Sequence, residues 1–457
     1  MRAAPSILLA LAIQTSGAQD SLNVRALFQW TDPSLPASLA HDNTYNEVWG
    51  HARNGREYAI IGSTMGTHFL DITDVDLGLV NEVGFVPGAF QGVAVVHRDM
   101  KTFGHHLYIV CDEGPSTLQV VDLQYLPDSV VVVYDSNDLL VRAHNIFIDT
   151  LQGRMYSCGG SSQFSVYDLQ DPAQPSLLLD LEADVPWWGQ TVGYVHDAYV
   201  REGIAHCHDE DGFSVVDLSD VNAPQLLGSL TMYPEPGYNH SGWLHEDGMY
   251  YAMCDETHGS RMKLMDVSDL SDIQVDTLFG SGVDTLSIAH NAIWQEDLLH
   301  TSYYHDGYWV WRLLPDGSLM EAGHYDTSHE PHAENYRGAW GVYPFLPSGR
   351  VLVSDMQTGL WVLEVDGSTA IAETSRPNGD LLVGPNPTPG PFSVQLPDEQ
   401  GGQLRLIDPV GRVIWTDHVM GSTYLADLTA LADGTYVLEF QREGLRLTSL
   451  IMKTSGR

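Results

Sequence analysis

The chain has 457 residues, of which 21 are Lys or Arg and 60 are Asp or Glu, so its formal net charge is −39. A charge of this size repels polyanions, and we therefore expect neither nucleic acid nor an anionic membrane surface as a partner. The excess carboxylates suit calcium and other cations, and they equally suit a simple role in keeping an exported protein soluble. The length is enough for two domains, each with its own core.

The first 18 residues have the three parts of a signal peptide. Arg2 supplies the positive charge, residues 7–13 (ILLALAI) form the apolar segment, and residues 16–18 (SGA) are the small residues before a cleavage site near Gln19. No later segment reaches the ~18 consecutive apolar residues of a membrane-spanning helix. We therefore expect export, an extracellular or cell-surface location and no transmembrane segment.

A unit of four short strands recurs seven times between residues 22 and 366. In Tyr194–Leu230, for example, the strands read YVHDAYV, GIAHCHDEDG, FSVVDLSD and VNAPQLLGSL. β-Branched and aromatic runs separated by Gly, Asp and Pro indicate antiparallel strands, and a period of about 45–50 residues is typical of a propeller blade. The sequence thus predicts an all-β fold, with a seven-bladed β-propeller over residues 22–366.

The last repeat, Gly338–Val365, has only three strands, whereas an isolated fourth-strand pattern occurs at Leu22–Trp30. We expect this N-terminal strand to complete the last blade, which would leave no open sheet edge. The four cysteines are 47, 49 and 47 residues apart, at equivalent positions of successive repeats: Cys111, Cys158, Cys207 and Cys254. Equivalent strands of neighbouring blades are about 10 Å apart, too far for a disulfide, so we expect packed free thiols.

The composition changes after the propeller. Residues 367–380 are small and polar, which is typical of a linker. Residues 381–457 alternate short strands with Pro-Gly, Val-Gly and Asp-Gly turns, a pattern that predicts a small β-sandwich domain of immunoglobulin-like type.

Two resemblances to known families follow from these segments. The tail resembles the C-terminal sorting domain of the type IX secretion system in residues 385–388 (PNPT), 408–413 (DPVGRV), 434–436 (GTY) and 451–453 (IMK). That resemblance implies an outer-membrane secretion machinery as partner, followed by release or attachment at the cell surface, with the tail usually removed.

The propeller region, residues 43–365, resembles the choice-of-anchor B family of surface proteins, whose units are related to LVIVD repeats. The matching segments include Gly66–Asp74 (GTHFLDITD), Gly237–Leu244 (GYNHSGWL) and Ala289–Ile293 (AHNAI). The sequence departs from the family at residues 91–92, where Gln-Gly replaces Arg-Asp. This family is defined by its architecture and anchoring, and it implies a location rather than a reaction.

Histidine recurs at the start of the first strand in four successive repeats, at His144, His196, His240 and His290. First strands line the channel of a propeller, so we expect these imidazoles at one mouth, together with carboxylates such as Asp197 and Asp255. Such groups could bind a divalent metal (Zn, Fe, Mn or Ca) or act as general bases, or they could simply connect the blades by hydrogen bonds. Two or three histidines with one carboxylate are the more plausible ligand set.

Other candidate features are weaker. The acidic turn at residues 209–212 (DEDG) offers oxygen ligands for calcium, and the pair Trp187-Trp188 could stack on a sugar or peptide, although packing is the simpler interpretation. The chain has no G-x-S-x-G, P-loop, H-E-x-x-H or G-x-G-x-x-G motif in a suitable context. Two functions therefore remain open: a binding module for a peptide, glycan or protein, and a metal-dependent enzyme that uses the histidines.

Overall fold

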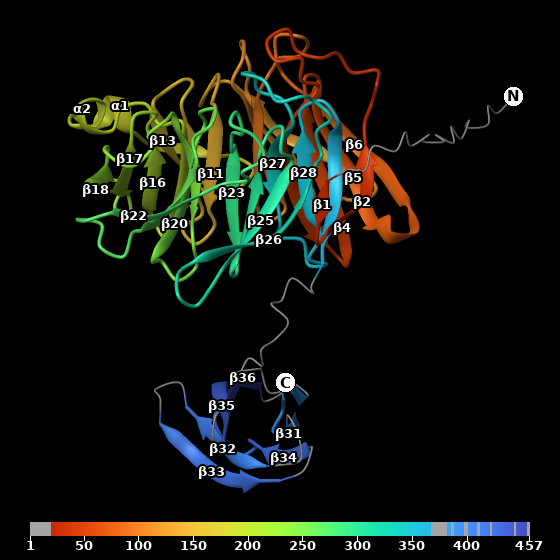
Figure 1. Cartoon of the computed structure of the whole chain (residues 1–457), viewed down its shortest axis with the longest axis vertical. Helices are drawn as coiled ribbons and strands as arrows, with labels where there is room; N and C mark the ends of the chain where they lie inside the picture. The colour runs from red at the N-terminus through yellow and green to blue at the C-terminus, as the bar shows by residue number, and fades with distance from the viewer. Residues whose placement is uncertain are drawn as a thin grey trace, which may run out of the picture. The chain divides into compact units, whose positions relative to one another are not determined.

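The computed structural model describes residues 20–366, 382–384, 388–396, 401–408, 412–420, 423–442 and 445–454 (Figure 1). The chain divides into two compact units between Thr369 and Ala370. The predicted signal peptide (residues 1–18) and linker (residues 367–380) lie outside the described residues, as do residues 385–387 and 409–411 of the tail motifs.

The first unit consists of antiparallel sheets in seven consecutive groups. The first three blades contain β3 (Tyr45–Arg53), β4 (Arg56–Ser63), β5 (Gly66–Asp74) and β6 (Leu79–Pro87); β7 (Arg98–Phe103), β8 (His106–Cys111), β9 (Leu118–Asp122) and β10 (Val131–Ser136); and β11 (Asn145–Asp149), β12 (Arg154–Cys158), β13 (Phe164–Asp168) and β14 (Ser176–Asp180). The fourth and fifth contain β15 (Asp197–Arg201), β16 (Ile204–His208), β17 (Phe213–Asp217) and β18 (Gln225–Leu230); and β19 (Asn239–Leu244), β20 (Tyr250–Asp255), β21 (Met262–Asp266) and β22 (Gln274–Phe279). The sixth contains β23 (Asn291–Gln295), β24 (Leu298–Ser302), β25 (Tyr308–Leu313) and β26 (Leu319–Tyr325), and the seventh β27 (Ala339–Tyr343), β28 (Val351–Asp355) and β29 (Gly359–Val365).

The first strands of the blades form a closed ring. Each contacts the first strand of the next blade, from β3 through β7, β11, β15, β19 and β23 to β27, and β27 contacts β3. This arrangement is that of a β-propeller, and it confirms the all-β propeller predicted from the repeats.

The N-terminal segment pairs with strands of both the sixth and the seventh blade. β2 (Val24–Trp30) pairs with β29 and gives the seventh blade its fourth strand. β1 (Ser21–Leu22) pairs instead with β26 of the sixth blade. The segment that the sequence presents as one strand is divided at Asn23, whose backbone is left-handed (φ 54°).

The strand order also explains which side chains are buried. Second and third strands such as β8 and β9 are buried along their whole length, whereas a fourth strand such as β10 is largely exposed. In every blade the register between the third and fourth strands shifts at least once, which twists the outer strand and hinders edge-to-edge association.

The four cysteines at the ends of second strands are free and buried, which confirms the prediction of packed thiols. The only helical segments among residues 20–366 are η1 (Val75–Leu77), α1 (Leu181–Asp184) and α2 (Trp188–Thr191). Trp188 is fully buried and stacks on Phe164 with ring centres 5.7 Å apart, so it packs the core rather than forming a platform. In the described part of the chain no helix has the length and apolar character needed to cross a bilayer.

The second unit contains two antiparallel sheets. One consists of β30 (Leu382–Gly384), β31 (Pro391–Gln395) and β34 (Thr423–Asp427); the other has the order β33 (Val413–Val419), β32 (Gly402–Ile407), β35 (Gly434–Arg442) and β36 (Leu445–Lys453). Phe392 and Val394 of the first sheet belong to the same apolar core as Leu404, Leu438 and Ile451 of the second.

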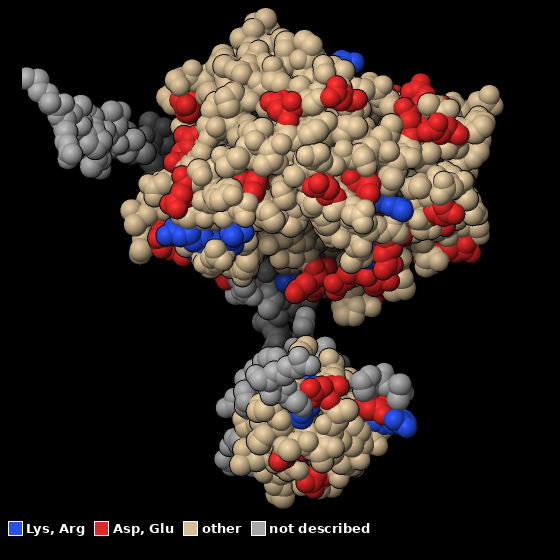
Figure 2. All heavy atoms as spheres, turned by 180° about the vertical axis from the view of Figure 1, so that it is seen from behind, with Lys and Arg blue, Asp and Glu red and all other residues tan. Residues whose placement is uncertain are grey.

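The charge of the chain is visible on the surface. Figure 2 shows acidic side chains spread over one face of the propeller, with only a few basic side chains among them.

Candidate metal centre at the channel mouth

Aromatic side chains from six blades form a closed ring at one mouth of the channel. Neighbouring ring centres are 4.1–4.5 Å apart over five contacts, and a sixth contact of 5.2 Å closes the circle. We call this circle of side chains the channel-mouth ring. In order, its members are His97, His144, His196, His240, His290 and Trp340. The four histidines predicted to converge do so, and the structure adds two members.

Hydrogen bonds fix the orientation of three of these imidazoles. Nδ1 of His290 lies 2.6 Å from the carbonyl oxygen of Trp340, and Nδ1 of His196 lies 3.3 Å from that of His240. Nδ1 of His144 lies 2.8 Å from the carboxylate of Asp112. Because these oxygens can only accept, Nδ1 carries the proton in each case, and a neutral imidazole keeps its lone pair on Nε2.

The protein holds most of the ring in the neutral form. Burial, together with the neighbouring imidazoles, keeps the pKa of His97, His196 and His240 well below the usual value, and burial lowers the pKa of His290 to about 3. His144 is the exception, because its hydrogen bond and ion pair with Asp112 outweigh burial and raise its pKa. Neutral imidazole is the form that binds metals.

One carboxylate completes a metal-binding cluster at this mouth. Glu256 follows β20, and its oxygens lie 4.0 Å from Nε2 of His240 and 3.9 Å from Nε2 of His290. Their ligand atoms all lie within 4.8 Å of one another. Tyr304 donates a hydrogen bond to the same carboxylate, and burial raises the pKa of Glu256 to about 7.

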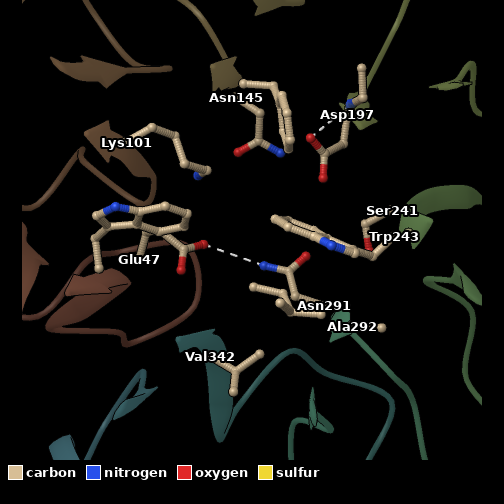
Figure 3. Close-up of a pocket in the computed structure, with 14 residues that line it drawn as sticks. Glu47, Lys101, Asn145, Asp197, Ser241, Trp243, Asn291, Ala292 and Val342 are labelled. Carbon is tan, nitrogen blue, oxygen red and sulfur yellow. Dashed lines mark hydrogen bonds between the residues drawn. The ribbon is translucent and has the colours of Figure 1, made fainter. Parts of the chain in front are cut away.

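The two predicted carboxylates lie elsewhere. Asp255 is fully buried and forms an ion pair of 2.7 Å with Lys263, while it accepts hydrogen bonds from Tyr233 and the backbone of Gly237. The Asp255 carboxylate is therefore fully engaged by protein groups. The next residue, Glu256, lies beside the histidines, where Asp255 was expected. Asp197 lies one layer below the ring, inside the channel (Figure 3).

That lower layer is a small charged cavity of about 40 Å³. Figure 3 shows Glu47 and Asp197 on opposite sides of it, with Lys101 and Asn145 between them. Lys101 forms an ion pair of 2.5 Å with Asp99. Burial lowers the pKa of Lys101, but the carboxylates of Asp99 and Glu47 outweigh it, so the pKa is raised. Burial raises the pKa of Glu47 to about 8 and that of Asp197 to about 7.

The sequence contained a signal for His97 that was missed. The first strand of the second blade begins at Arg98, directly after His97. Arg98 pairs with Cys111 as Asn145 pairs with Cys158, so His97 and His144 occupy equivalent positions. Aligning the repeats on their cysteines would have found it.

Three further histidines and the predicted acidic turn at residues 209–212 do not form part of this mouth. His324 contacts Glu321 and lies in β26, His332 pairs with Asp306, and His329 is exposed. In the acidic turn, Asp209 accepts a hydrogen bond from Ser214 and Glu210 accepts one from Tyr238, so protein donors occupy both carboxylates.

Above the channel-mouth ring, the mouth opens into a pocket of about 720 Å³. Its rim comes largely from loops and includes His41, Tyr238, His258, Glu334 and Tyr336. A space of this size can hold a small organic molecule or a side chain of a partner.

Comparisons with known proteins give a structural similarity and no family. No family model and no curated protein matches the sequence. Among solved structures, the chain is similar to the β-propeller domain of Myceliophteria thermophila Cps50 (Swd1), with 12% identity and a TM-score of 0.48 over 73% of this chain and 98% of that one.

Proposed function

We propose that this protein is an exported binding module whose propeller binds a divalent transition-metal ion with His240, His290 and Glu256. The observation that carries the proposal is the convergence of two Nε2 atoms and one carboxylate within 4.8 Å of one another. Two nitrogen ligands and one oxygen ligand suit Zn, Fe or Mn, whereas Ca prefers oxygen ligands throughout. The backbone acceptor on Nδ1 of His290 is the kind of partner that orients metal-binding imidazoles.

Three protein ligands leave a metal with at least one open coordination position. That position faces the pocket of about 720 Å³, whose rim carries Tyr238, Tyr336 and Trp340. A donor group of a peptide, a glycan or a protein partner could occupy it while its apolar part packs on the aromatic rim. The pocket thus supports a binding module in which the metal forms part of the ligand site.

A metal-dependent enzyme is the second candidate. It is favoured by the open coordination position, where a bound metal would hold a water molecule and lower the pKa of that water. Turnover that requires the metal and is lost in both His240→Ala and His290→Ala would distinguish the enzyme from the binding module.

The metal is tested with the mature full-length protein. Metal analysis after purification, followed by calorimetric titration of chelator-treated protein with Zn²⁺, should give stoichiometric binding that His240→Ala and His290→Ala abolish or weaken strongly. His300→Gln is a matched control, because His300 is equally buried but lies in β24 and shares a hydrogen bond with Tyr308. Failure of the wild-type protein to bind any transition metal at micromolar concentration would overturn the proposal.

We further propose that the protein is a surface protein of the choice-of-anchor B type, exported through a type IX secretion machinery by its tail. The support is the sequence pattern of the tail together with a shared core between its two sheets, as a β-sandwich sorting domain requires. Mass spectrometry of the secreted protein should find an N-terminus near Gln19 and a C-terminus within residues 367–380. A cytoplasmic protein, or one that ends at Arg457 in the medium, would contradict this route.

A further inference from the structure

The channel-mouth ring of six side chains is too wide for one central ion to contact all of them. Its six members are spaced 4.1–5.2 Å apart, and in a closed hexagon of this kind each member lies about as far from the centre as from its neighbours. A metal–nitrogen bond of about 2.0–2.1 Å places the centre of a bound imidazole about 3.2 Å from the ion. An ion must therefore lie off the axis, beside one pair of neighbouring histidines.

His240 and His290 are one such pair, with ring centres 4.5 Å apart and Glu256 beside them. The opposite edge of the hexagon is formed by His97 and His144, whose ring centres are 4.3 Å apart. An ion beside the first pair is displaced away from this second pair, and it cannot be bound by both.

The two edges are built from the same sequence pattern. His240 and His290 stand at the starts of neighbouring blades, and residues 254–256 (CDE) occur where the second strand of the first of those blades ends, at Asp255. His97 and His144 also stand at the starts of neighbouring blades, and residues 111–113 (CDE) occur where the second strand of the first of these ends, at Cys111. In sequence Glu113 is thus the counterpart of Glu256, and it lines the same mouth.

The nitrogen atoms at this second edge are available. His97 is only 3% exposed, and neither of its ring nitrogens has a hydrogen-bond partner. A buried polar atom without a partner is costly, and an unassigned ion is one of its common explanations. Nδ1 of His144 is held by Asp112 at 2.8 Å, which leaves Nε2 for a metal in the carboxylate–histidine arrangement of metal sites.

We propose that the mouth binds a second metal ion through His97, His144 and Glu113, opposite the ion at His240, His290 and Glu256. This inference rests on the proposed function, because it makes that site one half of a two-metal centre. Glu113 now accepts the backbone N–H of His97 at 3.2 Å, and it completes the second site by turning toward the two imidazoles. His196 lies between the two sets, and the same hexagon geometry puts ions inside its opposite edges about 3 Å apart, close to the ~3.5–4 Å of known two-metal sites.

The experiment counts ions by equilibrium dialysis of the full mature protein against Co²⁺, with EPR of the loaded samples. Wild type should bind two equivalents, and His97→Gln and His290→Gln should each bind one. The double variant should bind none, and His300→Gln should keep both. Two ions at this spacing couple magnetically, so the EPR signal of wild type should be smaller than the sum of the two single variants.

The outcomes separate the two proposals. If wild type binds one equivalent and His97→Gln also binds one, the second ion is wrong while the site at His290 stands. If wild type binds none, the proposed function itself fails. Two equivalents that persist in His97→Gln would place the second ion elsewhere and overturn the inference. Glu113→Gln, a nearly isosteric change, repeats the test if His97→Gln does not fold, as judged by its thermal melt.

Discussion

Three imidazoles in the mouth each donate to a different acceptor, and the acceptor influences the charge of the imidazole. His196 and His290 donate to backbone carbonyl oxygens, which orient the side chain without adding charge. His144 donates to Asp112, whose negative charge favours the protonated form. The ring therefore combines neutral members with one that readily takes up a proton, all within van der Waals contact of one another.

Replacing Asp112 with Asn should lower the pKa of His144 toward that of its neighbours. The Asp112 carboxylate is the strongest influence opposing burial, and the amide cannot supply its charge. Histidine titration by NMR in metal-free protein measures the shift. Glu256→Gln is the comparison, because Glu256 contributes a weaker attraction to His144. An unchanged titration of His144 in Asp112→Asn would show that the pair does not form in solution.

A second residue-scale prediction concerns stability in acid. Burial lowers the pKa of His300 to about 3, whereas an unfolded histidine titrates near 6.5, so between these values only the unfolded chain takes up the proton. The free energy of unfolding should therefore fall as the pH falls below 6.5, with His300 contributing about 1.4 kcal/mol per pH unit.

Urea unfolding of the propeller between pH 6 and pH 4.5 tests this contribution. His300→Gln should flatten the slope by about that amount, whereas the same change at the exposed His329 should leave it as in wild type. Equal slopes for the two variants would mean that His300 is protonated in the folded protein.

At the scale of the elements, the repeats predict the blades, whereas a local β-bulge determines which carboxylate lies beside the histidines. Cysteines at a repeated spacing marked the ends of second strands, and in the structure each of them is the last or next-to-last residue of its strand. The expected carboxylate at Asp255 was displaced because the register between β19 and β20 shifts between Asn239 and Ser241. Such a bulge changes which side chain faces the channel, and a single sequence does not reveal it.

Ring closure by β2 gives the element-scale prediction. Deleting residues 20–30 from the mature protein should remove the fourth strand of the seventh blade and expose the edge of β29. Val24 is buried in the core shared with Val310 and Trp361, and Ala26 packs against it, so we expect a loss of about 3–5 kcal/mol and a tendency to aggregate.

Deleting only residues 20–22 is the matched control for this truncation. It removes β1 from the outside of β26 but leaves β2 in place, and it should cost much less stability. Differential scanning calorimetry of the two proteins compares them directly. Equal melting temperatures for the longer deletion and wild type would contradict closure by β2.

At the scale of the whole molecule, the sequence predicted the repeat architecture and the face on which the histidines converge, but not the pocket above them. The ring follows from one position that recurs in six of the seven blades. The rim comes from loops, such as those that carry His41, His258 and Tyr336, whose conformation no repeat specifies. Specificity for a ligand depends on this rim, which explains why the sequence indicates a binding site without indicating its ligand.

The net charge provides the last prediction. With a formal charge of −39, repulsion among the carboxylates opposes the compact state at low ionic strength. Raising NaCl from 0.01 M to 0.15 M shortens the Debye length from about 30 Å to about 8 Å, so the melting temperature should rise, by about 2–4 °C for each kcal/mol gained. KCl should act equally, because screening depends on ionic strength rather than on the identity of the cation, and a chelator in all samples keeps metal binding out of the comparison. A melting temperature that is flat or falls across this range would mean that exposed ion pairs such as Arg25–Glu364 and Arg261–Glu235, which salt weakens, outweigh the long-range repulsion.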